Sequence, residues 1–331
     1  MSYISRLGSA FSKSSMFASE FFLDLYMYAH YCGISPFQDR RNKTYYKLII
    51  ETHAIEKGLS LANPRMLFGR KKITEIMKAA RRYGIGSNDL PILMATGALQ
   101  DYLALHRSAG LSDPLLDSID AFLKDRATAS AVLGSGGLRH YPDGMPSPSP
   151  EKAALLTSRF SCRMFSPEPL DAETVKEIVR IAQTAPSQCN RQATKIHFYS
   201  NRERIGQLLA LQAGSAGFAE TVTGLVVVAF DLAAWGGAQQ RNQGYVDASL
   251  FAMNLMLAAH AMGAASCPLN LAVPHSTERQ IKIVGEIPKD QRLVMMIALG
   301  RPADGPLKSA ASPRRTIDEI LTIRDQAVAA A

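Results

Sequence analysis

The sequence is most informative in two stretches, Ser158-Arg159-Phe160-Ser161-Cys162-Arg163 and Ala185-Pro186-Ser187-Gln188-Cys189-Asn190-Arg191-Gln192. The first can direct two guanidinium groups and a hydroxyl, those of Arg159, Ser161 and Arg163, at one phosphate. In the second, a Pro-Ser turn leads to two amides that can pair with the edge of a flat heterocycle. A nucleotide-like cofactor explains both stretches together, whereas an exposed basic turn and an ordinary polar loop explain them only separately.

The order of these motifs resembles that of a known family. Arg-x-Ser-x-Arg near the start of a domain, then a helix, then Ala-Pro-Ser-x-x-Asn-x-Gln, is similar to the FMN-dependent nitroreductase superfamily over about residues 152–321. The resemblance implies that Arg159, Ser161 and Arg163 hold the FMN phosphate and ribityl chain. It also implies that the isoalloxazine ring is lined by Pro186, Ser187, Asn190 and Gln192.

Two later stretches extend the resemblance. It places a loop over residues 264–271 against the flavin, where Pro268 sets the turn and a backbone N–H of Leu269, Asn270 or Leu271 points at flavin N5. The basic pair Arg314 and Arg315 would add phosphate contacts. No side chain is expected to serve as a catalytic acid or base, because the flavin carries the chemistry. Ala193-Thr194 stand where family members often have Pro-Trp, a departure that bears on the substrate range.

The resemblance implies an enzyme, an FMN-dependent NAD(P)H oxidoreductase. Hydride would pass through flavin N5 by a ping-pong route, from NADH or NADPH to an electron-poor small molecule. A homodimer with FMN at the subunit interface is expected, with the apolar helix at residues 244–262 forming much of the contact. Two alternatives stay open: a flavin-dependent dehydrogenase or ene-reductase of a specific, polysaccharide-related biosynthetic intermediate, and a non-catalytic flavin-binding scaffold protein.

Patterning divides the 331 residues into two parts. Helical periodicity without strand alternation predicts an all-helical domain at residues 1–133, in which the Ser-rich residues 1–15 are loose. This part resembles the segment that precedes nitroreductase-like domains in bacterial polysaccharide clusters. Gly, Pro and Ser predict a linker at 134–151. For residues 152–331 the expected fold is α+β and nitroreductase-like, a central mixed or antiparallel sheet flanked by helices, one of which is capped by Ser276.

Composition narrows the partners and the compartment. The net charge of +8 comes from basic residues that look dispersed, without a recognition helix or finger, so no nucleic-acid partner is predicted. No apolar run approaches the roughly 18 residues of a membrane span, and no signal peptide is recognised. A cytoplasmic protein is therefore expected.

Cysteine and histidine patterns give weaker indications. Four cysteines (Cys32, Cys162, Cys189 and Cys267) form no C-x-x-C pair and are better explained as small apolar side chains than as redox thiols. His53 and Glu56 could share a helix face as an acid–base or metal pair, but no second pair completes a metal cage, so a structural histidine is favoured and no metal is predicted. Asp247 and His260, on the helix at 244–262, are also interpreted as structural.

Overall fold

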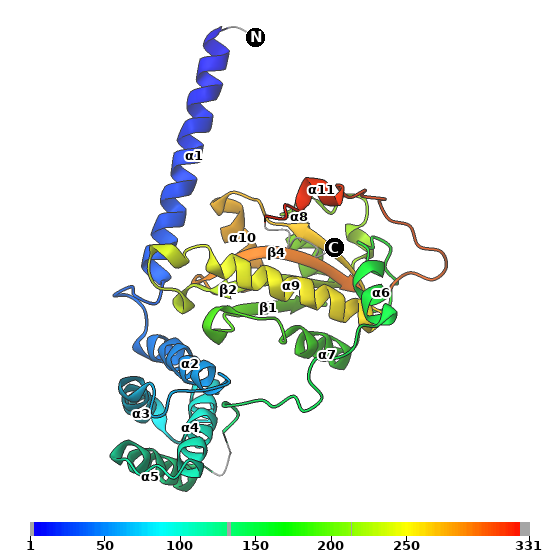
Figure 1. Cartoon of the computed structure of the whole chain (residues 1–331). Helices are drawn as coiled ribbons and strands as arrows, with labels where there is room; N and C mark the ends of the chain where they lie inside the picture. The colour runs from blue at the N-terminus through cyan, green and yellow to red at the C-terminus, as the bar shows by residue number, and fades with distance from the viewer. Residues whose placement is uncertain (1–2, 131–133, 213, 325–331) are drawn as a thin grey trace.

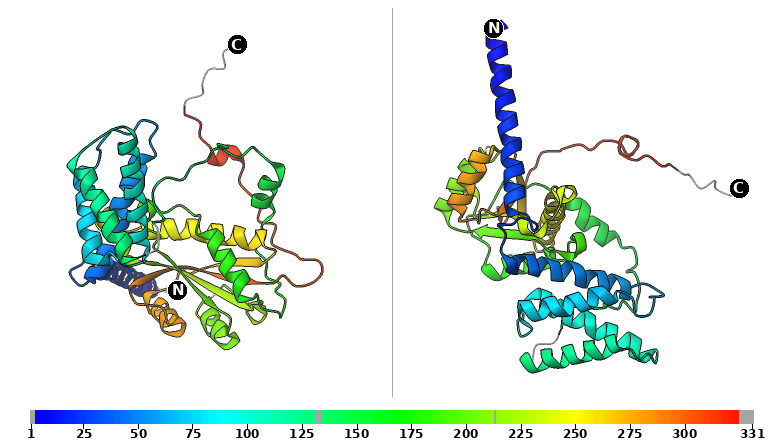
Figure 2. Two further views of the ribbon diagram at one scale, coloured as in Figure 1. Left: turned by 90° about the horizontal axis from the view of Figure 1, so that it is seen from below. Right: turned by 90° about the vertical axis from the view of Figure 1, so that its left-hand side faces the viewer.

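The N-terminal part of the chain is helical. The computed structural model describes residues 3–130, 134–212 and 214–324, with side chains from residue 14 onward. Five helices occupy the first range: α1 (Tyr3–Tyr31), α2 (Arg40–Leu59), α3 (Arg70–Gly84), α4 (Leu90–Ser108) and α5 (Pro114–Ala129). Helices α2 to α5 pack into a cluster, which we call the helical unit, while α1 projects away from the body as a single rod (Figures 1 and 2). The expected domain boundary at residue 133 falls outside the described residues.

The C-terminal part is built on one antiparallel sheet, which confirms the expected α+β fold. Its strands are β1 (Thr194–Tyr199), β2 (Gly224–Asp231), β3 (Ala265–Asn270) and β4 (Gln291–Gly300). They lie in the order β1-β2-β4-β3, and every neighbouring pair is antiparallel. The helices of this part are α6 (Pro150–Ser158), α7 (Ala172–Ala182), α8 (Arg202–Ala210), α9 (Gln243–Ala261), α10 (His275–Gly285) and α11 (Ile317–Ile320).

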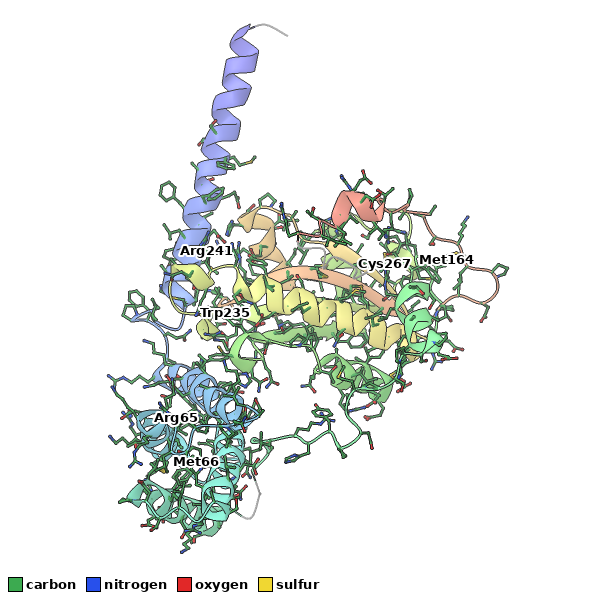
Figure 3. All side chains as sticks on the ribbon, viewed as in Figure 1. Arg65, Met66, Met164, Trp235, Arg241 and Cys267 are labelled. Carbon is green, nitrogen blue, oxygen red and sulfur yellow. The ribbon has the colours of Figure 1, made fainter. Side chains whose placement is uncertain are left out.

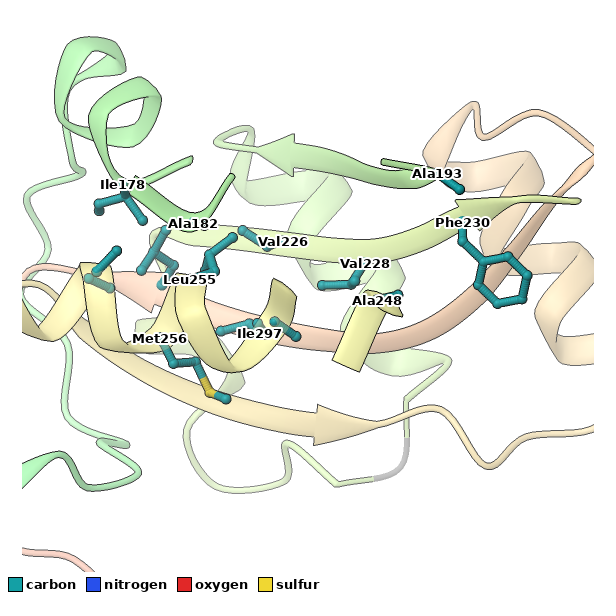
Figure 4. Packing of buried hydrophobic residues seen from close by; sticks show 14 of the residues in the cluster. Ile178, Ala182, Ala193, Val226, Val228, Phe230, Ala248, Leu255, Met256 and Ile297 are labelled. Atoms are coloured by element: carbon teal, nitrogen blue, oxygen red, sulfur yellow. The ribbon is translucent and has the colours of Figure 1, made fainter. Parts of the chain in front are cut away.

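Helices cover both faces of the sheet, which explains the unbroken apolar sequence of β2. Successive strand residues point to opposite faces, so Val226 and Val228 pack against α7 and α9 while Val227 and Ala229 pack against α8 and α10. Figure 4 shows α9 lying across the first of these faces. The helical unit has a separate apolar core of its own, built from α2 to α5.

Three polar contacts attach α1 and α2 to the C-terminal part. The Tyr46 hydroxyl donates to the Asp231 carboxylate at 2.6 Å, and the Tyr28 hydroxyl donates to the Gly237 carbonyl at 2.7 Å. Arg292 donates to Asp24 of α1 at 2.8 Å. Burial raises the pKa of Asp231, and the hydrogen bond from Tyr46 opposes that rise. The Tyr46 hydroxyl therefore stabilises a carboxylate that has little access to water. No helix among the described residues is long and apolar enough to cross a membrane.

Two expectations about the N-terminal part and the linker were wrong. Helix α1 starts at Tyr3, so most of residues 1–15 are helical, because Ile4, Leu7 and Phe11 continue the apolar period of the residues that follow. Helix α6 starts at Pro150, inside the expected linker, because the Ser149 hydroxyl caps it by accepting from the Lys152 N–H.

Two expectations about the C-terminal part were also wrong. The expected loop at 264–271 is mostly strand β3, and a proline is tolerated there because β3 lies at the edge of the sheet. Helix α10 begins at His275 and is not capped by Ser276. Its first N–H donates at 2.9 Å to Glu20 of α1, a cap from a distant part of the chain.

Packing between α9 and β2 predicts opposite effects for two glycine substitutions. A Cβ on Gly244 of α9 would lie 2.2 Å from the Phe230 ring, whereas a Cβ on Gly206 of α8 would meet nothing within 4 Å. We expect Gly244→Ala to lower the free energy of unfolding by about 1–3 kcal/mol. The matched Gly206→Ala should raise it by up to about 1 kcal/mol, because helical alanine is favoured over glycine. Denaturant unfolding measures both, and equal stabilities would contradict the packing.

Candidate functional site

The segment from Arg159 to Arg163, which we call the arginine segment, runs beside the edge strand β3. The Cys162 N–H donates to the Ser266 carbonyl at 3.0 Å, which fixes the segment against the strand. Arg163 is exposed and Arg159 is half-buried. The Nη1 atom of Arg159 is buried and has no hydrogen-bond partner among the described residues. A buried guanidinium nitrogen without an acceptor costs free energy, which a phosphate oxygen would offset.

Both guanidinium groups lie close to the same buried thiol. Burial raises the pKa of the Cys267 thiol, and the positive charges of Arg163 and Arg159 oppose that rise. Figure 3 shows Cys267 at this end of the sheet, near Met164. The electrostatics of the segment are therefore positive and suited to an anion.

Strand β3 places two further predicted residues at this edge. Pro268 and Asn270 are exposed and alternate with Leu269, which is buried in the core beneath. The Asn270 carbonyl accepts from the Gln212 side-chain amide at 2.8 Å, which ties the end of the strand to the segment after α8. The structure thus brings Pro268, Leu269 and Asn270 to the strand that Arg159–Arg163 follows.

The second motif, residues 185–192, forms a turn held by its own side chains and by α9. The Gln192 N–H donates to the Ser187 hydroxyl at 3.1 Å, and the Gln188 N–H donates to the Asp247 carboxylate at 2.9 Å. Cys189, Asn190 and Gln192 have φ values of 52°, 54° and 52°. Left-handed backbone at non-glycine residues costs free energy and persists only where the surroundings impose it, so this turn is pre-organised.

Arg191 has an internal role that sequence reasoning missed. Its side chain is buried at 4% exposure, donates through Nη1 to the Gln188 carbonyl, and lies 5.0 Å from the centre of the Trp235 ring. Figure 3 shows Trp235 at the end of the sheet that faces the helical unit. Arg191 therefore fixes the back of the turn, while Asn190 and Gln192 face outward from it. The only indication of this role in the sequence is that Arg191 lies within residues 185–192.

The helical unit borders this turn directly. Helix α2 packs against the short 3₁₀ helix η1 (Gln188–Asn190). The Asn190 side-chain amide donates to the Met94 sulfur of α4 at 3.7 Å. Nothing in the sequence distinguished Met94 from an ordinary core residue, since only the tertiary packing brings it to the turn.

The two motifs lie far apart within one chain. Asp247, near the start of α9, binds the turn, and His260, near its end, lies 2.7 Å from the Ser158 hydroxyl just before Arg159. The two residues are thirteen positions apart along α9, a rise of about 20 Å. The turn also enters β1 and the arginine segment follows β3, which are opposite edges of the sheet, about 14 Å apart over three strand spacings. One chain does not gather both motifs into one pocket.

Three other predicted features lie outside both motifs. Arg314 and Arg315 are exposed in the C-terminal segment, and no hydrogen bond or ion pair among the described residues joins either one to Arg159 or Arg163. His53 Nδ1 lies 3.1 Å from Glu56, and the other oxygen of that carboxylate accepts from the Gly137 N–H. Within the described ranges, no three His, Cys, Asp or Glu side chains are grouped so that they could hold a metal ion.

Comparison with known proteins identifies relatives of the part of the chain that carries both motifs. Residues 156–301 match the sequence model of the nitroreductase family. Over these residues the chain is similar to the nitroreductase family, and the match covers less than half of its length. A curated protein of Bacillus subtilis (strain 168), an FMN reductase [NAD(P)H], is 24% identical over 185 residues, which cover 52% of this chain and 74% of that protein.

Solved structures align with the same region. An FMN-dependent nitroreductase from Clostridium difficile has 17% identity and a TM-score of 0.44, covering 53% of this chain and 99% of that chain. NfrA2 from B. megaterium has 19% identity and a TM-score of 0.47, covering 54% of this chain and 76% of that chain. About half of this chain is thus matched, and the family match covers residues 156–301, where the arginine segment, the turn and β3 lie.

The buried carboxylate of Asp247 should control the order of the turn. Besides the Gln188 N–H, it accepts from the Gln243 side chain at 2.8 Å. Replacing it with alanine leaves both donors without their acceptor, at a cost of about 1–3 kcal/mol. We expect Asp247→Ala to accelerate amide hydrogen exchange at residues 186–192. Asp247→Asn keeps one acceptor oxygen and should have a smaller effect. Unchanged exchange in the alanine variant would contradict this role.

Proposed function

We propose that the C-terminal part of this chain binds FMN and acts as an NAD(P)H oxidoreductase on an electron-poor small molecule. The observation that carries the proposal is the buried Nη1 of Arg159, which has no acceptor among the described residues and lies in a region that matches the nitroreductase family. The name of the Bacillus subtilis relative, an FMN reductase [NAD(P)H], supports the same cofactor and donor.

The residues present fit this cofactor. Arg159, Ser161 and Arg163 would hold its phosphate, because two guanidinium groups and a hydroxyl supply the charged and neutral donors that phosphate oxygens need. Ser187, Asn190 and Gln192, on a turn whose backbone is fixed in advance, would contact the ring. Bound FMN would supply the hydride chemistry, and the backbone of Leu269 and Asn270 would lie at its reactive edge. Arg314 and Arg315 remain proposed as further phosphate contacts.

We further propose that one binding site needs two copies of the chain. Within a chain the arginine segment and the turn lie at opposite ends of α9 and at opposite edges of the sheet. A homodimer related by a two-fold axis could place the turn of one copy beside the arginine segment of the other. Apolar residues on the outer side of α9, Val246, Leu250 and Met253, are 50%, 45% and 42% exposed and could be covered by such a contact.

The helical unit favours a second, narrower activity. Met94 contacts Asn190, and α2 packs on the turn, so the helical unit restricts access to the ring-binding residues from that side. A restricted site suits a dehydrogenase or ene-reductase with one specific biosynthetic substrate better than a reductase of broad range. A flavin-binding scaffold is the outcome if neither NADH nor NADPH reduces the bound flavin.

Flavin content tests the proposed cofactor. The purified protein should be yellow and should release FMN on denaturation. Arg159→Ala and Arg163→Ala should each weaken FMN binding by roughly tenfold or more, because each removes a charge-assisted hydrogen bond to phosphate. Arg279→Ala is a matched control, since Arg279 is exposed on α10 and is joined to Arg159 or Arg163 by no contact among the described residues. A colourless protein that takes up no added FMN would reject the assignment.

Complementation between two defective chains tests the shared site. One chain carries Arg159→Ala and Arg163→Ala, and the other carries Asn190→Ala and Gln192→Ala. If each site combines segments of two subunits, a mixed dimer has one intact site and one doubly defective site. Co-expression should therefore restore about one flavin per mixed dimer. If both motifs of one chain served the same site, every site would stay defective and no flavin would return.

A further inference from the structure

The excess positive charge of the chain is concentrated in α2, α3 and their connection, contrary to the expected even spread. Residues 40–84 contain twelve Lys and Arg against three Asp and Glu, a net charge of +9. The whole chain carries +8, so the other residues together sum to −1. Like charges at this density repel one another unless acidic side chains or a bound anion compensate them.

Part of this charge is compensated by acidic side chains. Arg70 pairs with Asp113 at 2.8 Å, and Arg81 pairs with Asp125 at 2.9 Å, so α3 is tied to the acidic helix α5. Lys72 and Lys78 pair with Glu51 and Glu75. These cations have a structural explanation and need no ligand.

A second group of cations has no such partner and shares a groove. A groove of about 550 Å³ lies between the first turns of α2 and the last turn of α3, and we call it the α2–α3 groove. Its lining is mainly basic and consists of Arg40, Arg41, Thr44, Lys47, Ala79, Arg82 and Tyr83. Among the described residues, Arg40, Lys47 and Arg82 form no salt bridge, and all three are exposed.

The acidic groups beside the groove are already engaged. Asp89 accepts from Arg41 at 2.9 Å and from the Tyr83 hydroxyl at 2.5 Å. These contacts lower the pKa of Asp89, with the Tyr83 hydrogen bond as the largest cause. Asp39 caps α2 by accepting from the Arg41 and Asn42 N–H groups. Three cations therefore converge on one concave surface without a protein anion to neutralise them.

We propose that the α2–α3 groove binds a ligand bearing two adjacent phosphate groups. One phosphate ester carries about 1.5 to 2 negative charges at neutral pH, so two of them match the three free cations better than one does. The arginines at 40 and 82 provide planar forks for phosphate oxygens, and Lys47 provides a compact charge in the same groove. A volume of about 550 Å³ lies within the usual range for small-ligand pockets.

This site is separate from the proposed flavin site. Tyr46, on another face of α2, reaches the sheet through Asp231, while Arg40 and Lys47 face α3. A confined groove also favours a compact diphosphate over an extended nucleic acid, which would need a continuous cationic track. The diphosphate could be free in solution or carried on a lipid headgroup, since the groove recognises the same chemistry in both.

Calorimetric titration of the full-length protein with inorganic pyrophosphate tests the proposal. The protein should bind pyrophosphate, with an affinity that falls as salt rises, and pyrophosphate should raise the melting temperature. The triple variant Arg40→Gln, Lys47→Gln and Arg82→Gln should bind at least about 100-fold more weakly, because each charge-assisted contact contributes roughly tenfold. Its thermal unfolding without ligand confirms that it is folded.

A matched control removes the same charge elsewhere in the segment. Lys57→Gln, Arg65→Gln and Lys71→Gln together change three exposed cations that do not line the groove and form no salt bridge among the described residues. Figure 3 shows Arg65 on the helical unit. This control should bind pyrophosphate within about twofold of the wild type. An equal loss in the control would show a diffuse charge effect and overturn the proposal.

Flotation with lipid vesicles distinguishes the two sources of the ligand. Flotation with phosphatidylcholine vesicles that contain diacylglycerol pyrophosphate should reveal a headgroup ligand, through binding that the triple variant loses and the control keeps. Pyrophosphate binding without flotation indicates a soluble diphosphate, and either result supports the groove. Absence of pyrophosphate binding, or tight binding of single-stranded RNA that pyrophosphate does not displace, would contradict the proposal.

Discussion

Helix α9 sets the spacing on which the candidate site depends. It is buried against the sheet along most of its length, and each end holds one chemically distinctive segment. Asp247 near its start binds the turn at residues 185–192, and His260 near its end contacts the residue before Arg159. Because a helix has a fixed rise, these segments cannot approach each other within the chain. We therefore propose that one cofactor contacts segments from two subunits.

The N-terminal helices affect the site through the same turn. Helix α2 packs on η1, Met94 contacts Asn190, and Tyr46 reaches the end of β2. A structural change in the helical unit would therefore first displace the residues proposed to contact the ring. The helical unit also has its own apolar core, and residues 40–84 within it carry a net charge of +9. We propose both that the helical unit borders the flavin site and that it binds a second ligand in the α2–α3 groove.

Much of the fold could be predicted from local patterns. Asp113, Asp171 and Asn201 are of the residue types that typically cap helices, and each accepts from an N–H in the first turn of its helix. The strands near 195, 224 and 293 follow from alternating or unbroken apolar runs. The start of α10 could not be predicted, because its cap comes from Glu20, 255 residues away. The strand β3 was missed because a proline argues against a strand unless its position at the edge is known.

The candidate site was predictable in its residue types but not in its geometry. Residues 159–163 lie against β3 through the Cys162–Ser266 hydrogen bond, and their distance from the turn depends on strand order and on the length of α9. The buried position of Arg191 and the contact of Met94 with Asn190 arise from tertiary packing, which leaves no periodic signal in the sequence. The compensation of charges in α2 and α3 also requires the pairing of distant side chains.

The central claim is that two copies of the chain enclose one phosphorylated ring between them. A crystal structure grown with FMN tests it most directly. The account predicts that the phosphate lies on Arg159 and Arg163 of one subunit and that the ring lies against residues 186–192 of the other. A flavin bound elsewhere, or held by both segments of a single subunit, would contradict it.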